Sequence, residues 1–181
     1  MTSAVDTQKT ELTQSQICQC FNKVFSAKFA VRLVGGGKEP DYFPATAMRP
    51  GLIVARENFA ASALHEAAHW CVASRTRRAL PDYGYPYNPP PRTPAEQAQF
   101  FANEARAQAV EWYLSRRAGN RFSASADDPD FSQTALAQFQ SELWPMVTHW
   151  ETAAGAMDAP PRALLFGQAL QGLRTETLAW A

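Results

Sequence analysis

Apolar side chains recur at helical spacing in three stretches of the chain. The first, residues 12–25, and the second, residues 95–117, each carry apolar residues three and four positions apart, which predicts an amphipathic helix in each. From residue 131 onwards the same spacing predicts two or three more helices, with breaks near Pro145 and Pro160–Pro161.

A further helix is expected to begin after Asn58, which is a suitable N-cap residue, and to run to about Ala79. Its last turns would contain three arginines, at a helix end where positive charge is favourable: Arg75, Arg77 and Arg78.

Two short apolar runs, residues 30–34 and 51–56, predict strands. We expect Gly35–Gly37 to form a flexible turn after the first of them. No internal repeat and no second domain is evident. The pattern therefore predicts a single α+β domain over residues 12–181, mainly helical with a small β-sheet, after a flexible tail formed by residues 1–11.

The composition is that of an ordinary globular protein with balanced charge. Lys and Arg together number 17, as do Asp and Glu, so nonspecific binding to nucleic acid is not expected. No apolar run approaches ~20 residues, which argues against a membrane span. The amino terminus lacks the layout of a secretory signal, and three cysteines do not suggest a disulfide framework. We therefore expect a reduced, cytoplasmic protein.

The motif that carries chemistry is His-Glu-x-x-His, formed by His65, Glu66 and His69. Residues four apart on a helix are surface neighbours, so both imidazoles can point at one ion. Imidazole ligands suit a first-row transition metal better than calcium or magnesium. The chain has only three histidines, and two of them lie here, on a helix predicted independently of the motif. We therefore expect a zincin-like metal helix.

A catalytic site with two histidine ligands is expected to have a third protein ligand. Glu104 is the better candidate, because Gln108 and Glu111 follow it at helical spacing and give the next helix a polar face that can line a cavity. The remaining histidine, His149, lies beside a tryptophan in an amphipathic region, where a structural role is more common.

This ligand set leaves three kinds of protein open. Two histidines and a carboxylate bind zinc in one class of metallopeptidases, in which Glu66 would be the general base. The same set forms the facial triad of non-haem iron enzymes. A structural metal site in a protein-binding module is the third possibility, although such a site is normally closed by four protein ligands.

Three segments taken together resemble the elongation factor P hydroxylase family of bacterial proteins. They are "KEPDYFPA" (38–45), "FAASALHEAAHWCVASRTRRALPDYGY" (59–85) and "QFFANEARAQAVEW" (99–112), and they occur in this order. The resemblance spans roughly residues 21–119 and is most specific around the His-Glu-x-x-His-Trp-Cys stretch.

The resemblance implies hydroxylation of a lysine of elongation factor P, usually after that lysine has received a β-lysyl group. It implies Fe(II) as the metal, with zinc possible in the purified protein, and molecular oxygen as co-substrate. Carried over by motif, His65, His69 and Glu104 would hold the metal, and Glu66 would be the neighbouring catalytic group. The chain lacks the many short strands of a jelly-roll oxygenase, which agrees with the unconventional scaffold of this family.

A lysine-derived substrate is long and cationic, which suggests the residues that would bind it. Asp82 and Glu111 are the acidic candidates, and Gln108 shares the polar face of the third ligand. Tyr83 and Tyr85 could form pocket walls or cation–π contacts. A zinc metallopeptidase remains the alternative function.

Overall fold

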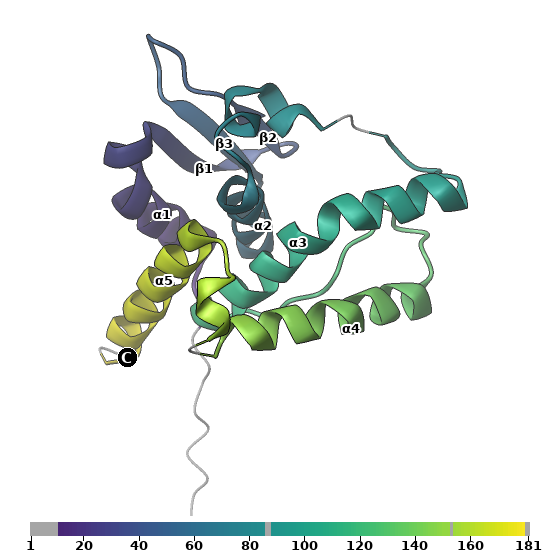
Figure 1. The fold of residues 1–181 in the computed structure, drawn as a ribbon. Coiled ribbons are helices and arrows are strands. Elements are labelled where there is room, and N and C mark those ends of the chain that lie inside the picture. Colours follow the sequence, from purple (N-terminus) through teal and green to yellow (C-terminus); the bar gives the residue numbers. More distant parts are fainter. Residues whose placement is uncertain (1–10, 86–87, 153, 180–181) are drawn as a thin grey trace, which may run out of the picture.

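The structure is a computed structural model that describes residues 11–85, 88–152 and 154–179. These residues form one hydrophobic core beneath a small sheet (Figure 1). The helices are α1 Gln14–Phe29, α2 Ala60–Val72, α3 Pro94–Ala118, α4 Gln133–Trp150 and α5 Pro161–Ala179, joined in part by the 3₁₀ turns η1 Arg77–Ala79, η2 Pro81–Gly84 and η3 Gly155–Met157. The tail expected over residues 1–11 lies, except for Glu11, outside the described residues.

The sheet has three strands in the order β1-β3-β2, namely β1 Val31–Gly37, β2 Asp41–Phe43 and β3 Gly51–Arg56. β1 runs parallel to β3, with Leu33 opposite Ile53, and β2 runs antiparallel to β3. Inward residues of β1 and β3 are buried and alternate with more exposed ones, so one face of the sheet is covered. α1 and α2 contact the sheet, and α2 follows β3 after a short turn.

An aromatic cluster fills the space where the helices meet below the sheet. Phe21 and Phe25 of α1 contact Trp70 of α2 at ring-centroid distances of 5.3 and 4.9 Å, and Phe166 of α5 completes the cluster. All four side chains are buried, and large aromatic groups of this kind contribute strongly to the free energy of folding. This cluster fixes the position of the motif helix.

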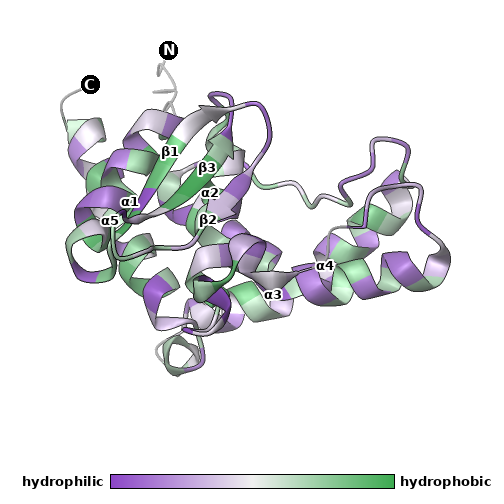
Figure 2. Ribbon diagram, turned by 90° about the horizontal axis from the view of Figure 1, so that it is seen from above, coloured by the Kyte–Doolittle hydropathy of each residue, from purple (hydrophilic) through white to green (hydrophobic). Residues whose placement is uncertain are grey.

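Helices α3 and α4 form an arm that extends to one side of the sheet (Figure 2). α3 contacts α2 and α5 as well as α4, so one helix belongs to both the body and the arm. It begins with a capping box between Thr93 and Glu96, has Pro94 in its first turn, and ends at Gly119 in the left-handed conformation. The predicted helix over residues 95–117 is confirmed.

The motif helix is shorter than expected at its C-terminal end. It stops at Val72, so the three arginines lie beyond it and not in its last turns. Arg162 of α5 and Arg78 donate hydrogen bonds to backbone carbonyl groups at this end, including that of Ala73. These bonds satisfy carbonyl groups that the end of a helix leaves without a partner.

The N-cap prediction for the same helix was also wrong. Phe59, not Asn58, occupies the cap position, and it makes no side-chain hydrogen bond there. The Gln14 side chain of α1 donates instead to the carbonyl groups of Arg56 and Phe59. A contact from a segment distant in the sequence therefore holds α1 against the start of the helix.

Two expected breaks are absent within the described residues. Pro145 lies inside α4, where Phe139, Leu143 and Val147 are buried on both sides of it, so packing keeps the helix continuous. Gly35–Gly37 extend β1 and do not form a separate turn, with a shift in register against β3.

The three cysteines are free and buried: Cys18, Cys20 and Cys71. Burial raises the pKa of Cys71 to about 12, which keeps this thiol protonated. No helix among the described residues has the length and apolar character needed to cross a membrane.

Candidate metal centre

Two imidazoles of α2 point at a common position. His65 and His69 lie one turn apart, and their Nε2 atoms are 3.0 Å from each other. Both side chains are largely buried between α2 and α3. The expectation that helical spacing brings the two rings together is therefore met.

Glu104 supplies a carboxylate to the same position from α3. Its oxygens lie 3.7 Å from His65 Nε2 and 3.5 Å from His69 Nε2. One ligand atom from each of the three residues lies within 4.8 Å of the others. Among the described residues, this is the group of His, Cys, Asp and Glu side chains that could hold a metal ion.

The spacing of these donors fits a transition-metal ion. Two ligand atoms bound at about 2.1 Å to one ion lie roughly 3.0 Å apart at a right angle and roughly 3.4 Å apart at the tetrahedral angle. The separation of 3.0 Å between the two Nε2 atoms matches the right-angle value, and the separations of 3.5 and 3.7 Å to the Glu104 oxygens lie slightly above the tetrahedral value. Three protein ligands also leave coordination positions open, as in catalytic metal sites.

Glu111 lies behind His65, on the side away from the shared position. Its Oε2 is 2.8 Å from His65 Nδ1, so that Nδ1 donates and Nε2 remains available to a metal. Burial by itself lowers the pKa of His65, but the charges of Glu111, Glu66 and Glu104 and the hydrogen bond to Glu111 raise it to about 10. We expected Glu111 to bind substrate; its contact is with a candidate ligand instead.

Glu104 is held in the ionised form. Burial raises its pKa, but hydrogen bonding to His69 and Gln108 and the charges of both histidines lower it to about 2. Gln108 also bonds both backbone groups of Ser125, with Nε2 donating to the carbonyl oxygen at 2.8 Å and Oε1 accepting from the N–H at 3.0 Å. Gln108 is 1% exposed, and its hydrogen bonds are to Glu104 and to this loop.

Glu66 is a buried carboxyl group beside the cluster, with 8% of its surface exposed. Burial raises its pKa, although the charges of His65 and His69 partly oppose this effect. Its carboxylate makes no hydrogen bond within the described part of the chain, so it is free to exchange a proton or to bind a ligand.

The tyrosine-rich turn η2 lies next to His69. The ring of Tyr83 stacks on the His69 ring at 6.1 Å and on the Tyr42 ring at 4.2 Å. Tyr85 is exposed and has the Arg77 guanidinium 4.1 Å from its ring centroid. Of the two tyrosines expected to contact substrate, Tyr83 is therefore the one beside the cluster.

An acidic pair, Asp82 and Asp41, lies at this turn. The Asp82 carboxylate accepts a hydrogen bond from the backbone N–H of Tyr42 and interacts with Asp41. Burial and the neighbouring Asp82 raise the pKa of Asp41. Sequence reasoning found Asp82 but missed Asp41, which lies in the "KEPDYFPA" segment and pairs with β3.

His149 lies outside the metal cluster. Its Nε2 is 2.8 Å from the Asp158 carboxylate, and both side chains are exposed. The expectation of a structural role for His149 is consistent with this contact.

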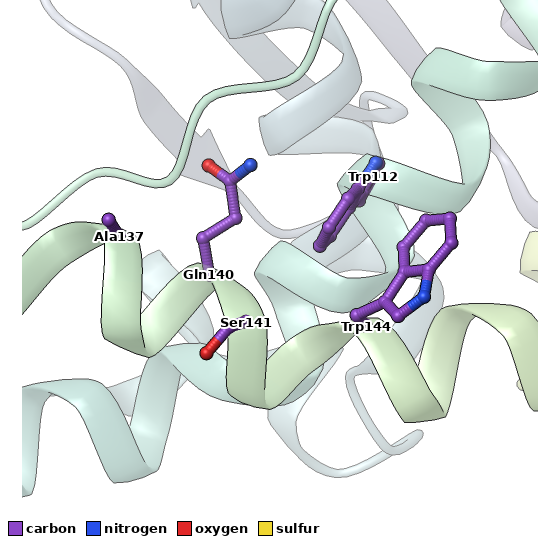
Figure 3. A pocket seen from close by; sticks show the side chains of 5 residues that line it. All are labelled: Trp112, Ala137, Gln140, Ser141 and Trp144. Carbon is purple, nitrogen blue, oxygen red and sulfur yellow. The ribbon is translucent and has the colours of Figure 1, made fainter.

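A separate hollow of about 360 Å³ lies on the arm between α3 and α4 (Figure 3). It is lined by Trp112, Ala137, Gln140, Ser141 and Trp144. None of these side chains is a strong metal ligand or a titratable group, and the candidate ligands do not line it. The hollow is therefore distinct from the metal cluster.

Comparisons with known proteins agree with this geometry. A model of the family described as Elongation factor P hydroxylase matches residues 20–178, which extends the resemblance through α4 and α5. The Elongation factor P lysine hydroxylase of Haemophilus influenzae is 45% identical over 132 residues, which cover 72% of this chain and 74% of that protein. The chain therefore belongs to the elongation factor P hydroxylase family.

Proposed function

We propose that this protein is a metal-dependent enzyme that hydroxylates a lysine of translation elongation factor P. The observation that carries the proposal is the family match over residues 20–178, because it includes both helices that bear the metal cluster. This membership does not support the zinc metallopeptidase alternative. Since the substrate is a translation factor, we place the reaction in the cytoplasm.

In this proposal His65, His69 and Glu104 hold Fe(II). The ion supplies the redox chemistry that lets oxygen react with an unactivated C–H bond. Glu111 fixes the ring of His65 through Nδ1, and Gln108 helps to keep Glu104 ionised and in place.

The remaining residues act on the substrate side chain and on protons. Glu66 is buried and its pKa is raised by that burial, which suits a group that takes up or gives a proton next to the metal. Asp82, together with Asp41, provides negative charge for a cationic lysine side chain, and the exposed Tyr85 offers an aromatic face at the edge of the same turn.

The intact mass of elongation factor P tests the proposal. The β-lysylated factor is incubated with Fe(II)-loaded protein, reductant and air, and a gain of one oxygen atom is expected. His65→Ala and His69→Ala should each abolish the gain, because each removes a metal ligand. His149→Ala is the matched control, since it removes the one remaining histidine, which is exposed and outside the cluster, and should leave the gain intact.

The opposite result is equally informative. If folded, iron-loaded protein adds no oxygen to a verified substrate, the hydroxylase proposal fails. Zinc-loaded protein would then be tested against a peptide library, where cleavage that disappears in Glu66→Gln would support the metallopeptidase alternative.

A further inference from the structure

The hydroxyl group of Tyr83 is buried beside the metal cluster and is unpartnered within the part of the chain that the structure describes. Tyr83 is 4% exposed, and its Oη has no hydrogen-bond partner among the described residues. A buried hydroxyl group without a hydrogen-bond partner lowers folding stability. Phenylalanine at this position would avoid the cost, so the hydroxyl group calls for a functional explanation.

The surroundings of Tyr83 are those of the reaction site. Its ring lies 6.1 Å from the ring of the candidate ligand His69, at an interplanar angle of 17°. Among the charged groups around its hydroxyl, Glu66 has the largest effect, and it acts with burial to raise the pKa of Tyr83 well above the ordinary value. A phenol hydroxyl group can donate a hydrogen bond.

The backbone of the turn is held in a conformation that positions this side chain. Asp82 and Tyr83 have φ angles of 46° and 58°, in the left-handed region that bulky residues rarely adopt. Two contacts oppose relaxation of the turn. Arg77 Nη1 donates to the Tyr83 carbonyl oxygen at 3.0 Å, and Asp82 Oδ1 accepts from the Tyr42 N–H at 3.1 Å. Strain maintained in this way is typical of functional sites.

Tyr42 provides a natural comparison for Tyr83. The two rings stack at 4.2 Å with an interplanar angle of 8°, and both are almost fully buried. The Tyr42 hydroxyl group, however, donates to the Arg78 carbonyl oxygen at 2.7 Å. One tyrosine of the pair thus binds the backbone of η1 through its hydroxyl group, and the hydroxyl group of the other has no partner among the described residues.

We propose that Tyr83 is a catalytic residue whose hydroxyl group donates a hydrogen bond to the oxygen co-substrate at the open side of the metal centre. The inference rests on the proposed hydroxylase function and adds a residue to it. Glu66 follows His65 in the chain and the Tyr83 ring stacks on His69, so a buried carboxyl group and a hydrogen-bond donor both lie beside the candidate ligands.

The test compares Tyr83→Phe with Tyr42→Phe in the Fe(II)-loaded full chain. Tyr83→Phe should lower turnover at least ~10-fold and raise the KM for oxygen, while the KM for elongation factor P stays unchanged. Its melting temperature in the metal-free state should equal or exceed that of the wild type, because an unsatisfied group has been removed. Tyr42→Phe should melt at a lower temperature and keep turnover per folded molecule.

Binding of nitric oxide, an oxygen surrogate, gives a readout that does not need hydroxylation. Its affinity for the Fe(II)-loaded protein, followed by visible absorption, should be several-fold weaker in Tyr83→Phe than in the wild type. The inference would be overturned if Tyr83→Phe kept the turnover and the nitric oxide affinity of the wild type. It would also be overturned if Tyr83→Phe lost melting temperature and turnover together, as the replacement of a structural residue does. A wild type that binds nitric oxide but adds no oxygen to elongation factor P would sink only the proposed function.

Discussion

The two ring nitrogens of His65 have different partners, and this difference decides what the residue can do. Nδ1 faces Glu111, whereas Nε2 faces His69 and Glu104. A carboxylate on the far nitrogen fixes the tautomer and ring orientation and makes the near nitrogen a better metal donor. In the proposed metal centre, Glu111 would therefore act on the metal through His65.

Replacement of Glu111 tests this indirect effect on metal binding. Glu111→Gln should weaken metal affinity about 10- to 100-fold, because it removes the charge behind His65 without removing a ligand. Competition with a chelator measures the dissociation constant. Glu176→Gln, at an exposed position of α5, is the control and should leave the constant unchanged. An unchanged constant in Glu111→Gln would refute the role assigned to Glu111.

The raised pKa of His65 also makes a prediction for the metal-free protein. The protonated ring is favoured in the folded state, with a pKa of about 10 against an ordinary 6.5, so its stabilising effect is complete below pH 6.5 and is lost as the pH rises towards 10. Stability should fall between pH 6.5 and 9, by at most about 1.4 kcal/mol per pH unit. Urea unfolding at several pH values measures the slope, and a flat profile would contradict the prediction. Glu111→Gln should flatten it.

Residue spacing predicted which side chains meet, but it did not predict the partner of every side chain. Helical spacing was sufficient for His65 and His69 to be expected together, and the polar face of the next helix singled out Glu104 as the third group. Glu111 and Gln108 lie on the same face as Glu104, yet one contacts a histidine and the other a loop. These partners depend on how α2 crosses α3, and that crossing is set by core packing far from the motif.

At the scale of elements, the C-terminal end of α2 shows how a distant residue can define a helix boundary. Arg162 Nη2 donates to the carbonyl oxygens of Cys71 and Ala73 at 2.8 and 2.6 Å, and its guanidinium lies 5.1 Å from the Trp70 ring centroid. It thereby satisfies carbonyl groups that a helix end leaves open, and its positive charge lies at the negative end of the helix dipole.

Loss of Arg162 should therefore destabilise the protein. Arg162→Ala is expected to lower the free energy of unfolding by about 2 kcal/mol, because charge-assisted hydrogen bonds to buried carbonyl groups are lost. For a chain of this size the melting temperature should fall by roughly 6 °C, which differential scanning calorimetry can detect. Arg121→Ala, at an exposed position after α3, should change the melting temperature little. Equal effects of the two replacements would argue against the capping role.

The elements that the sequence predicted best carry their own boundary signals. α3 has a capping box, an initial proline and a terminal glycine, and the limits of β3 agree with the apolar run at residues 51–56. α2 has no side-chain N-cap, and Gln14 at one end and Arg162 at the other contact it from distant parts of the chain. Such contacts join segments more than 40 positions apart and leave no local pattern in the sequence.

At the scale of the whole molecule, the metal centre depends on helices that bear no ligand. Glu104 and Glu111 lie on α3, and α3 is held between α2 and α5. α5 approaches α3 closely at Gly167, where a β-carbon would come within 2.6 Å of the Tyr113 ring. Tyr113 lies two positions after Glu111, so the packing of α5 bears on the position of the cluster.

Two glycines of α5 allow this dependence to be tested within one helix. Gly167→Ala should lower the free energy of unfolding by roughly 1–3 kcal/mol, because the new methyl group meets Tyr113 in a packed interior. Gly172→Ala adds the same group where nothing lies within 4 Å, and it should stabilise the helix by up to about 1 kcal/mol. Urea unfolding measures both changes, and a chelator competition shows whether metal affinity falls in Gly167→Ala alone. If both replacements stabilise the protein equally, α5 does not press on α3 at Gly167, and the metal centre does not depend on this contact.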